Sequence, residues 1–219
     1  MIDPTKVLVA TPALDAKVEC GYAGGLAASA MGHLFGNMTF LALVSHVALA
    51  RNIIAHQFLA SPFDWLVCID SDIGFSPDDF RKLMDYPPYH ETVNPEGTTL
   101  NEHGEALIVC AEYSKKQDTF EGVRFGLGFT RIHRSVFERL AKTVDGSGRG
   151  VVDQFQNRGQ LMDDYFPSGA IEAGMWRGED TGFFLLCRIA GIVPRVEQRT
   201  RLIHVGRKEY PYLPPVTGA

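Results

Sequence analysis

The stretch "WLVCIDSDIGF", Trp65–Phe75, decides the fold class of this sequence. Its first half is a short, continuous apolar run, which is typical of a strand that is buried on both faces of a sheet. The run ends on two carboxylates, Asp70 and Asp72, with only Ser71 between them. Two like charges at one strand end repel each other, so this pattern predicts that a positively charged group binds there.

Apolar strand patterns alternate with helical patterns on both sides of this stretch. Residues 86–105 are rich in proline, glycine and glutamate and are expected to be a loop, and residues 144–178 are expected to be a long functional loop. The alternation predicts an α/β domain with a mostly parallel central sheet flanked by helices. Further strands are predicted at residues 6–11, 38–44, 106–110 and 193–196, and helices at 24–34, 45–61, from 76, from 135 and at 180–191.

Local signals set several of these boundaries. Pro12 is expected to close the first strand, and Ser45 and Ser76 are predicted N-caps of the helices that follow them. In the segment after residue 122, Gly126 and Gly128 are expected to break a strand before the next helix begins. The proline-rich end, residues 207–219, is predicted to be a tail.

Composition limits the classes of protein that this chain can represent. With 219 residues the simplest expectation is one domain. The 21 basic and 26 acidic residues give a net charge of −5, which argues against nucleic-acid binding by bulk electrostatics. Neither a signal-peptide pattern nor a long apolar run is present, and three of the four cysteines lie in apolar runs. These features predict buried thiols and a cytoplasmic setting.

The paired carboxylates lie where α/β proteins bind ligands. In open α/β sheets, ligands bind beyond the carboxyl ends of the strands, and Asp70, Asp72 and Thr11 all follow predicted strands. Mg²⁺ and Mn²⁺ prefer one or two carboxylates together with phosphate oxygens of a substrate. The pattern therefore predicts a metal–diphosphate site, and the alternative is a solvated turn that leads into the next helix.

Two features further along the chain support a polar site, each with a simpler alternative. Glu179 and Asp180 begin a predicted helix, where acidic residues either favour the helix dipole or accept a proton from an incoming hydroxyl. His204 ends an apolar run and is either structural or a metal ligand. Earlier in the chain, Glu112 and Tyr113 follow a predicted strand and either line a ligand pocket or belong to a charged loop.

The order of these motifs resembles that of the GT-A-fold glycosyltransferases. A strand that ends in "TP" is followed by "ARN", "IDSDIGFSP", "GLGFTRIHRSVFE", "GED" and "HVG". The chain looks most like small family-two-type members of viral, phage or bacterial type, and the resemblance extends from Thr11 to Gly206. It implies one GT-A domain over residues 1–219, with a nucleotide-binding half at 1–110, an acceptor and catalytic half at 111–206, and the tail.

The resemblance also implies roles for single residues. The donor would be a nucleotide-diphosphate sugar, such as a UDP- or GDP-sugar, and the cofactor Mn²⁺ or Mg²⁺. Asp180 matches the base of inverting members, with Glu179 beside it. The implied metal ligands are Asp70, Asp72 and His204. The residues implied to contact the donor are Thr11, Pro12, Arg51, Asp70, Ser71 and Asp72. Arg207 and Lys208 either neutralise the leaving diphosphate or belong to a solvated basic face.

Two other functions remain open at this stage. A metal-dependent nucleotidyltransferase uses similar carboxylate chemistry, but it would favour a basic, glycine-rich loop after the first strand, where only Lys17 is available. A non-catalytic carbohydrate- or partner-binding domain could share the fold. The acceptor of a transferase is equally open and includes a glycan, a lipid-linked intermediate, a protein or a modified nucleobase.

Overall fold

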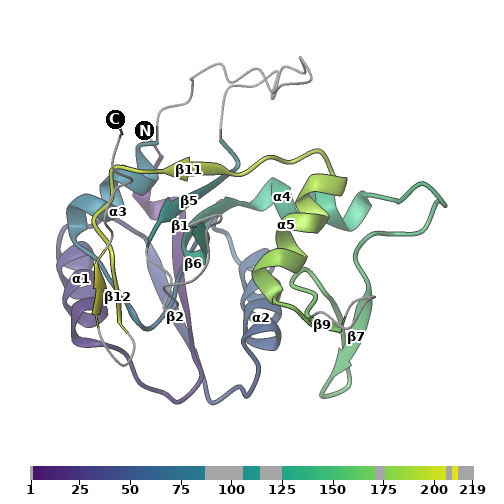
Figure 1. Cartoon of the computed structure of the whole chain (residues 1–219), viewed down its shortest axis with the longest axis horizontal. Coiled ribbons are helices and arrows are strands. Elements are labelled where there is room, and N and C mark those ends of the chain that lie inside the picture. The colour runs from purple at the N-terminus through teal and green to yellow at the C-terminus, as the bar shows by residue number, and fades with distance from the viewer. Residues whose placement is uncertain (1, 87–105, 114–124, 171–175, 206–208, 212–219) are drawn as a thin grey trace, which may run out of the picture.

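A six-stranded sheet forms the centre of the computed structural model, which describes residues 2–86, 106–113, 125–170, 176–205 and 209–211 (Figure 1). The strand order is β2-β1-β3-β6-β5-β11, and β6 runs antiparallel to both of its neighbours while the other pairs are parallel. The predicted mostly parallel α/β sheet is therefore confirmed. The strands are β1 (Val7–Ala13), β2 (Asn37–Ala42), β3 (Trp65–Ile69), β5 (Ile108–Glu112), β6 (Phe125–His133) and β11 (Arg195–Glu197).

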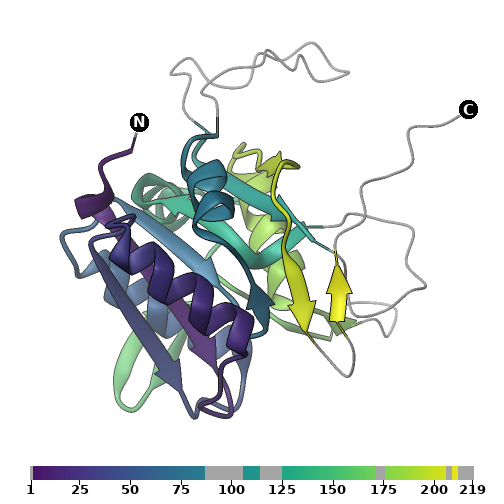
Figure 2. The ribbon, with the colours of Figure 1, turned by 90° about the vertical axis from the view of Figure 1, so that its left-hand side faces the viewer.

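Helices cover both faces of this sheet and enclose two apolar cores. One core takes Leu66 and Cys68 of β3 and packs against α2, α4 and α5. The other takes Val67 and Ile69 and packs against α1 and α3, and Figure 2 shows α1 lying over the strands on this side. All five residues of β3 are buried, as its apolar run predicted. The helices are α1 (Cys20–Met31), α2 (Val47–Leu59), α3 (Pro77–Met84), α4 (Arg134–Lys142) and α5 (Glu179–Ile189), after a short 3-10 turn η1 (Pro4–Lys6).

Short strands outside the central sheet correct the expectation for the second half of the chain. Residues 144–178 are not one loop, because β7 (Gln154–Asn157) and β8 (Gln160–Asp163) form a hairpin. Its turn has positive φ at Arg158 (48°) and Gly159 (83°), the geometry of a type I′ turn. Short strands also form two further small sheets: β9 (Gly169–Ala170) pairs with β10 (Trp176–Arg177), and β12 (Ile203–Val205) pairs with both β4 (Ile73–Gly74) and β13 (Glu209–Pro211). The expected tail therefore contains β13.

The predicted boundaries are confirmed at α3 and wrong at three other places. Ser76 caps α3 in a reciprocal capping box with Asp79, as its sequence indicated. Pro12 does not close β1 but lies inside it, where β3 has ended and β1 pairs with β2 alone, an edge position that tolerates proline. His46, not Ser45, is the N-cap of α2. The glycines at 126 and 128 do not end β6, which continues through them, although its register with β5 shifts there.

Two predictions from composition can also be compared with the structure. Cys68, Cys110 and Cys187 are buried and Cys20 is exposed. Burial raises the pKa of Cys68 to about 11 and that of Cys187 to about 12, so these thiols stay protonated at neutral pH. Among the described residues, no helix has the length and apolar character that crossing a membrane requires.

Candidate functional site

The turn between β3 and β4 carries Asp70, Ser71 and Asp72, and backbone hydrogen bonds fix its shape. The N–H of Ile73 donates to the carbonyl of Asp70 at 3.1 Å and closes the turn. Glu19, the N-cap of α1, donates to the carbonyl of Ser71 at 2.9 Å, and Val205 of β12 donates to that of Asp72 at 2.8 Å. Two segments distant in sequence, the start of α1 and β12, therefore hold this turn, and both aspartate side chains remain partly exposed.

Close packing of α1 against β4 also fixes the turn. A Cβ on Gly25 would lie 2.2 Å from the carbonyl oxygen of Phe75, and a Cβ on Gly21 would lie 3.2 Å from the Cα of Gly74. The small residues of α1 therefore let the helix approach the strand that follows the carboxylates. On the other side, β12 pairs with β4 and places His204 opposite Ile73.

Arg51 is the cation around which the carboxylates gather. Its side chain is 2% exposed, and its Nη2 donates to Oδ1 of Asp70 at 2.9 Å. Its Nε lies 3.6 Å from Oε1 of Glu179, and Nη2 lies 4.0 Å from Oδ1 of Asp180. Arg51 thus joins the end of β3 to the start of α5, so the structure brings together four residues that the sequence predicted separately.

The charge balance of this cluster shifts the pKa values of its members. Burial opposes the charged form of Arg51, but the surrounding carboxylates of Asp70, Asp180 and Glu179 outweigh it and raise the pKa of the guanidinium. Burial also raises the pKa of Asp70; Arg51 opposes this shift, and the charges of Asp180 and Asp72 add to it. One buried cation faces three carboxylates, so the site has an excess of negative charge.

Glu179 and Asp180 occupy the first turn of α5, as predicted. Asp180 is held from β6 as well as by Arg51, because the N–H of Leu127 donates to its Oδ2 at 3.3 Å. A carboxylate in the first turn of a helix has its ionised form favoured by the helix dipole. This geometry suits a group that accepts a proton.

Asp72 and His204 form a second polar pair beside the arginine cluster. Nε2 of His204 lies 3.7 Å from Oδ2 of Asp72, and the histidine ring packs edge-on against Tyr113 at a centroid distance of 5.4 Å. In the described part of the chain, no three His, Cys, Asp or Glu side chains are grouped to hold a metal ion. Two adjacent donors nonetheless fit a Mg²⁺ or Mn²⁺ ion that completes its coordination with substrate phosphates.

Of the other residues implied by the resemblance, two are buried and two lie outside the described part of the chain. Thr11 is fully buried, and its hydroxyl is hydrogen-bonded to that of Tyr22, while Pro12 is buried beside it. Both residues are therefore part of the packed interior in this structure. Arg207 and Lys208 lie outside the described residues.

The structure adds two residues that the sequence did not assign to the site, Gly126 and Gly128, and brings Tyr113, a candidate pocket residue in the sequence, against both of them. Tyr113 is 6% exposed, and burial raises the pKa of its phenol well above the usual value, with Asp70 and Asp180 adding to the shift. The signal in the sequence was "GLG", which looked like a strand break. The other residues of β6 have larger side chains. Two glycines in such a strand could have indicated a place where other groups approach the backbone closely.

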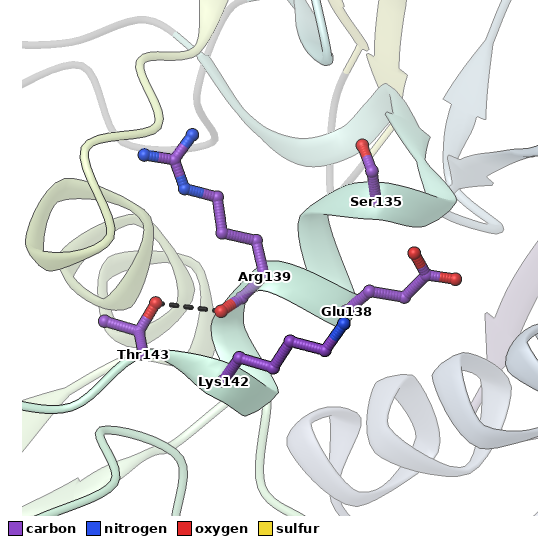
Figure 3. Close-up of a pocket in the computed structure, with 5 residues that line it drawn as sticks. All are labelled: Ser135, Glu138, Arg139, Lys142 and Thr143. Carbon is purple, nitrogen blue, oxygen red and sulfur yellow. Dashed lines mark hydrogen bonds between the residues drawn. The ribbon is translucent and has the colours of Figure 1, made fainter.

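A hollow of about 380 Å³ lies along α4 (Figure 3). The hydroxyl of Thr143 donates to the carbonyl of Arg139 at 2.8 Å beside it. None of its lining residues belongs to the carboxylate cluster, so this hollow is not the site described above. The lining residues are Ser135, Glu138, Arg139, Lys142 and Thr143.

This sheet, with one antiparallel strand inserted between parallel ones and acidic residues at the end of β3, defines a GT-A-like α/β fold. Among solved structures, A197 from STIV is similar with a TM-score of 0.54 and 18% identity over 98% of this chain and 97% of that chain. A glycosyltransferase involved in glycosylation of the major capsid of PBCV-1 matches with a TM-score of 0.37 and 15% identity over 60% of this chain and 61% of that chain. No protein-family model matches the sequence, and no curated protein does. The similarity to A197 shows a shared fold.

Proposed function

We propose that this protein is a metal-dependent glycosyltransferase that moves a sugar from a nucleotide-diphosphate sugar to an acceptor hydroxyl. The observation that carries the proposal is the convergence of Asp70 from β3 and Asp180 from α5 on one buried guanidinium, within 2.9 Å and 4.0 Å of Arg51. A diphosphate donor needs carboxylates that bind its metal ion, and an acceptor hydroxyl needs a carboxylate that accepts its proton. This arrangement places carboxylates for both roles beside each other.

The donor half of the proposed site is the turn after β3. Asp72 and His204 would hold Mn²⁺ or Mg²⁺. Asp70, which is ion-paired with Arg51, would be the third residue of the donor half. When bound, the cation would offset the charge that develops on the leaving diphosphate. We assign donor binding to residues 1–110, with a UDP- or GDP-sugar as donor, and Arg207 and Lys208 would add positive charge near the diphosphate.

The acceptor half is the start of α5. Asp180 would accept the proton of the acceptor hydroxyl, and Glu179 lies next to it on Arg51. A base that acts on the acceptor corresponds to an inverting transfer, which we favour. The acceptor classes that we consider are those named from the sequence: a glycan, a lipid-linked intermediate, a protein or a modified nucleobase.

The nucleotidyltransferase alternative is less well supported. It needs a basic group on the loop after β1, and the side chain of Lys17 there is 82% exposed and lies 4.0 Å from Asp15. A lysine paired at the surface is poorly suited to cradle phosphates. A purely binding domain has no need to group three carboxylates on one buried cation, because such a cluster carries a desolvation penalty.

A thermal-shift screen tests the proposal without knowledge of the acceptor. The protein is heated with each of several UDP- and GDP-sugars, in Mn²⁺ and in excess chelator. A donor at about 100 times its dissociation constant adds about 2.7 kcal/mol to the stability, which gives a readily measured shift. Stabilisation by a nucleotide sugar in Mn²⁺ that chelator removes is the expected result. No stabilisation by any of them, or equal stabilisation in chelator, would contradict the metal-dependent donor site.

A further inference from the structure

β6 departs from regular pairing beside the carboxylate cluster. Its register with β5 jumps from Thr130 to Phe125, while β5 advances only from Cys110 to Glu112. The residues between, Gly126–Phe129, therefore bulge relative to β5, while Phe129 still pairs with Ile69 of β3. Bulges are common next to functional sites because they redirect the chain and release backbone groups from the sheet.

The backbone of this segment bonds to the residues of the proposed site. The N–H of Leu127 donates to the carboxylate of Asp180 at 3.3 Å, and the carbonyl of Gly128 accepts from the N–H of Asp70 at 2.8 Å. The hydroxyl of Thr130 donates to the carbonyl of Gly126 at 2.7 Å and closes the bulge. Asp70 and Asp180 are thus attached to the same three residues, Gly126–Gly128, which we call the glycine bulge.

Side chains of the site also occupy the space above the two glycines. A Cβ on Gly126 would lie 2.5 Å from Oδ2 of Asp180 and 2.8 Å from the hydroxyl of Tyr113. A Cβ on Gly128 would lie 2.8 Å from the same hydroxyl and 2.9 Å from Oδ2 of Asp70. At these distances a Cβ could be accommodated only if the carboxylates or the Tyr113 hydroxyl moved, and the Tyr113 hydroxyl lies against both positions.

We propose that the glycine bulge is a positioning element that sets the separation between the donor carboxylate Asp70 and the base Asp180, with the Tyr113 hydroxyl as the spacer between its two glycines. Gly128 governs donor binding and Gly126 governs proton removal. This assignment rests on the proposed function. Glycine inside a strand weakens it by roughly 0.5–1 kcal/mol relative to alanine, so two of them in one strand need a reason beyond stability.

Single alanine substitutions separate the two halves of the site. The atoms that each new Cβ meets are the ends of side chains, so we expect Gly126→Ala and Gly128→Ala to fold with displaced carboxylates. Gly128→Ala should weaken binding of UDP or GDP in Mn²⁺ by about tenfold or more, measured by calorimetry. Gly126→Ala should keep this affinity within about threefold and lower transfer by about a hundredfold, as small misplacements of reacting groups do. Gly24→Ala, whose Cβ meets no atom within 4 Å, is the matched control.

Removal of the Tyr113 hydroxyl provides a second test. In Tyr113→Phe/Gly128→Ala the new Cβ no longer meets the hydroxyl, so part of the donor affinity should return relative to Gly128→Ala alone. The same partial recovery of transfer is expected for Tyr113→Phe/Gly126→Ala. No recovery in either double variant would contradict the spacer role of Tyr113.

Crystal structures of the two variants without ligand make the outcome independent of the proposed function. Asp180 should be displaced in Gly126→Ala with Asp70 in place, and the reverse is expected in Gly128→Ala. If the parental protein binds no nucleoside diphosphate, the proposed function fails while these displacements still test the bulge. Undisplaced carboxylates in both variants, or two variants that behave like Gly24→Ala in every assay, would overturn the inference.

Discussion

Replacing Arg51 with methionine should destabilise the protein strongly, because it removes a buried cation that lies among three carboxylates. Methionine keeps much of the buried volume, so the effect is mainly electrostatic. At an effective dielectric constant of about 20, one ion pair at 4 Å is worth about 4 kcal/mol. The pairs with Asp70 and Glu179, at 2.9 Å and 3.6 Å, count most, since those side chains are 29% and 18% exposed. Asp180 is 38% exposed and its share is reduced by solvent screening.

The net effect is smaller than the sum of these pairs, because the parental cluster carries its own desolvation penalty. Loss of one partner from a buried ion pair typically lowers the free energy of unfolding by about 3–5 kcal/mol, and we expect a loss in this range for Arg51→Met. Arg51→Lys should lose less, since an ammonium keeps the charge but cannot reach three carboxylates as a planar fork does.

Urea denaturation at pH 7, with the midpoint and the slope both fitted, measures this loss. The matched control is Arg149→Met, which removes an exposed pair with Asp153 in which the side chains are 73% and 70% exposed. That change should alter stability by less than about 1 kcal/mol. The reasoning is refuted if Arg51→Met is as mild as the control, or if Arg51→Lys is as damaging as Arg51→Met.

Two further variants test other parts of the account. Asp72→Ala should abolish the Mn²⁺ dependence of UDP or GDP binding in calorimetry and leave the melting temperature nearly unchanged. The control is Asp78→Ala, which removes a surface ion pair with Lys82 and should not affect binding. A metal dependence that survives Asp72→Ala would contradict the assignment of Asp72 as a metal ligand. Burial raises the pKa of Tyr22 to about 12, so its contribution to stability is fully present below the unfolded value near 10 and is lost as pH rises from about 10 to 12. Between pH 8 and pH 11, Tyr22→Phe should therefore lose less of its free energy of unfolding than the parental protein loses. If both proteins lose the same amount, Tyr22 ionises freely in the fold and the reasoning is wrong.

Local sequence patterns predicted those elements whose signals lie within a few residues. The apolar run of β3 identified a strand buried on both faces, and the "SPDD" segment identified the capped start of α3. The antiparallel direction of β6 could not be predicted in this way, because it depends on pairing with β3 and β5, which are distant in sequence. The β7–β8 hairpin was missed because an Arg-Gly turn is a weaker signal than Asn-Gly.

The sequence predicted the acidic residues of the site but not the contacts that hold them in position. Asp70 and Asp180 were found because carboxylates at a strand end and at a helix start have chemical meaning without further context. Arg51 was expected near a nucleotide, and its place among the carboxylates follows from the packing of α2 against β3 and α5. The glycine bulge required the tertiary structure, because a glycine's neighbours above the sheet cannot be inferred from adjacent residues.

The most direct test of the central claim is the rate at which the protein releases nucleoside diphosphate from a nucleotide sugar in Mn²⁺ with an acceptor, compared between the parental protein and Asp180→Asn. The amide keeps the size of Asp180 and removes its ability to accept a proton. General-base loss typically lowers the rate by about a hundred- to ten-thousand-fold, and we predict a fall of this order with donor affinity nearly unchanged. Transfer by Asp180→Asn at the parental rate would contradict the account, as would a parental protein that turns over no nucleotide sugar.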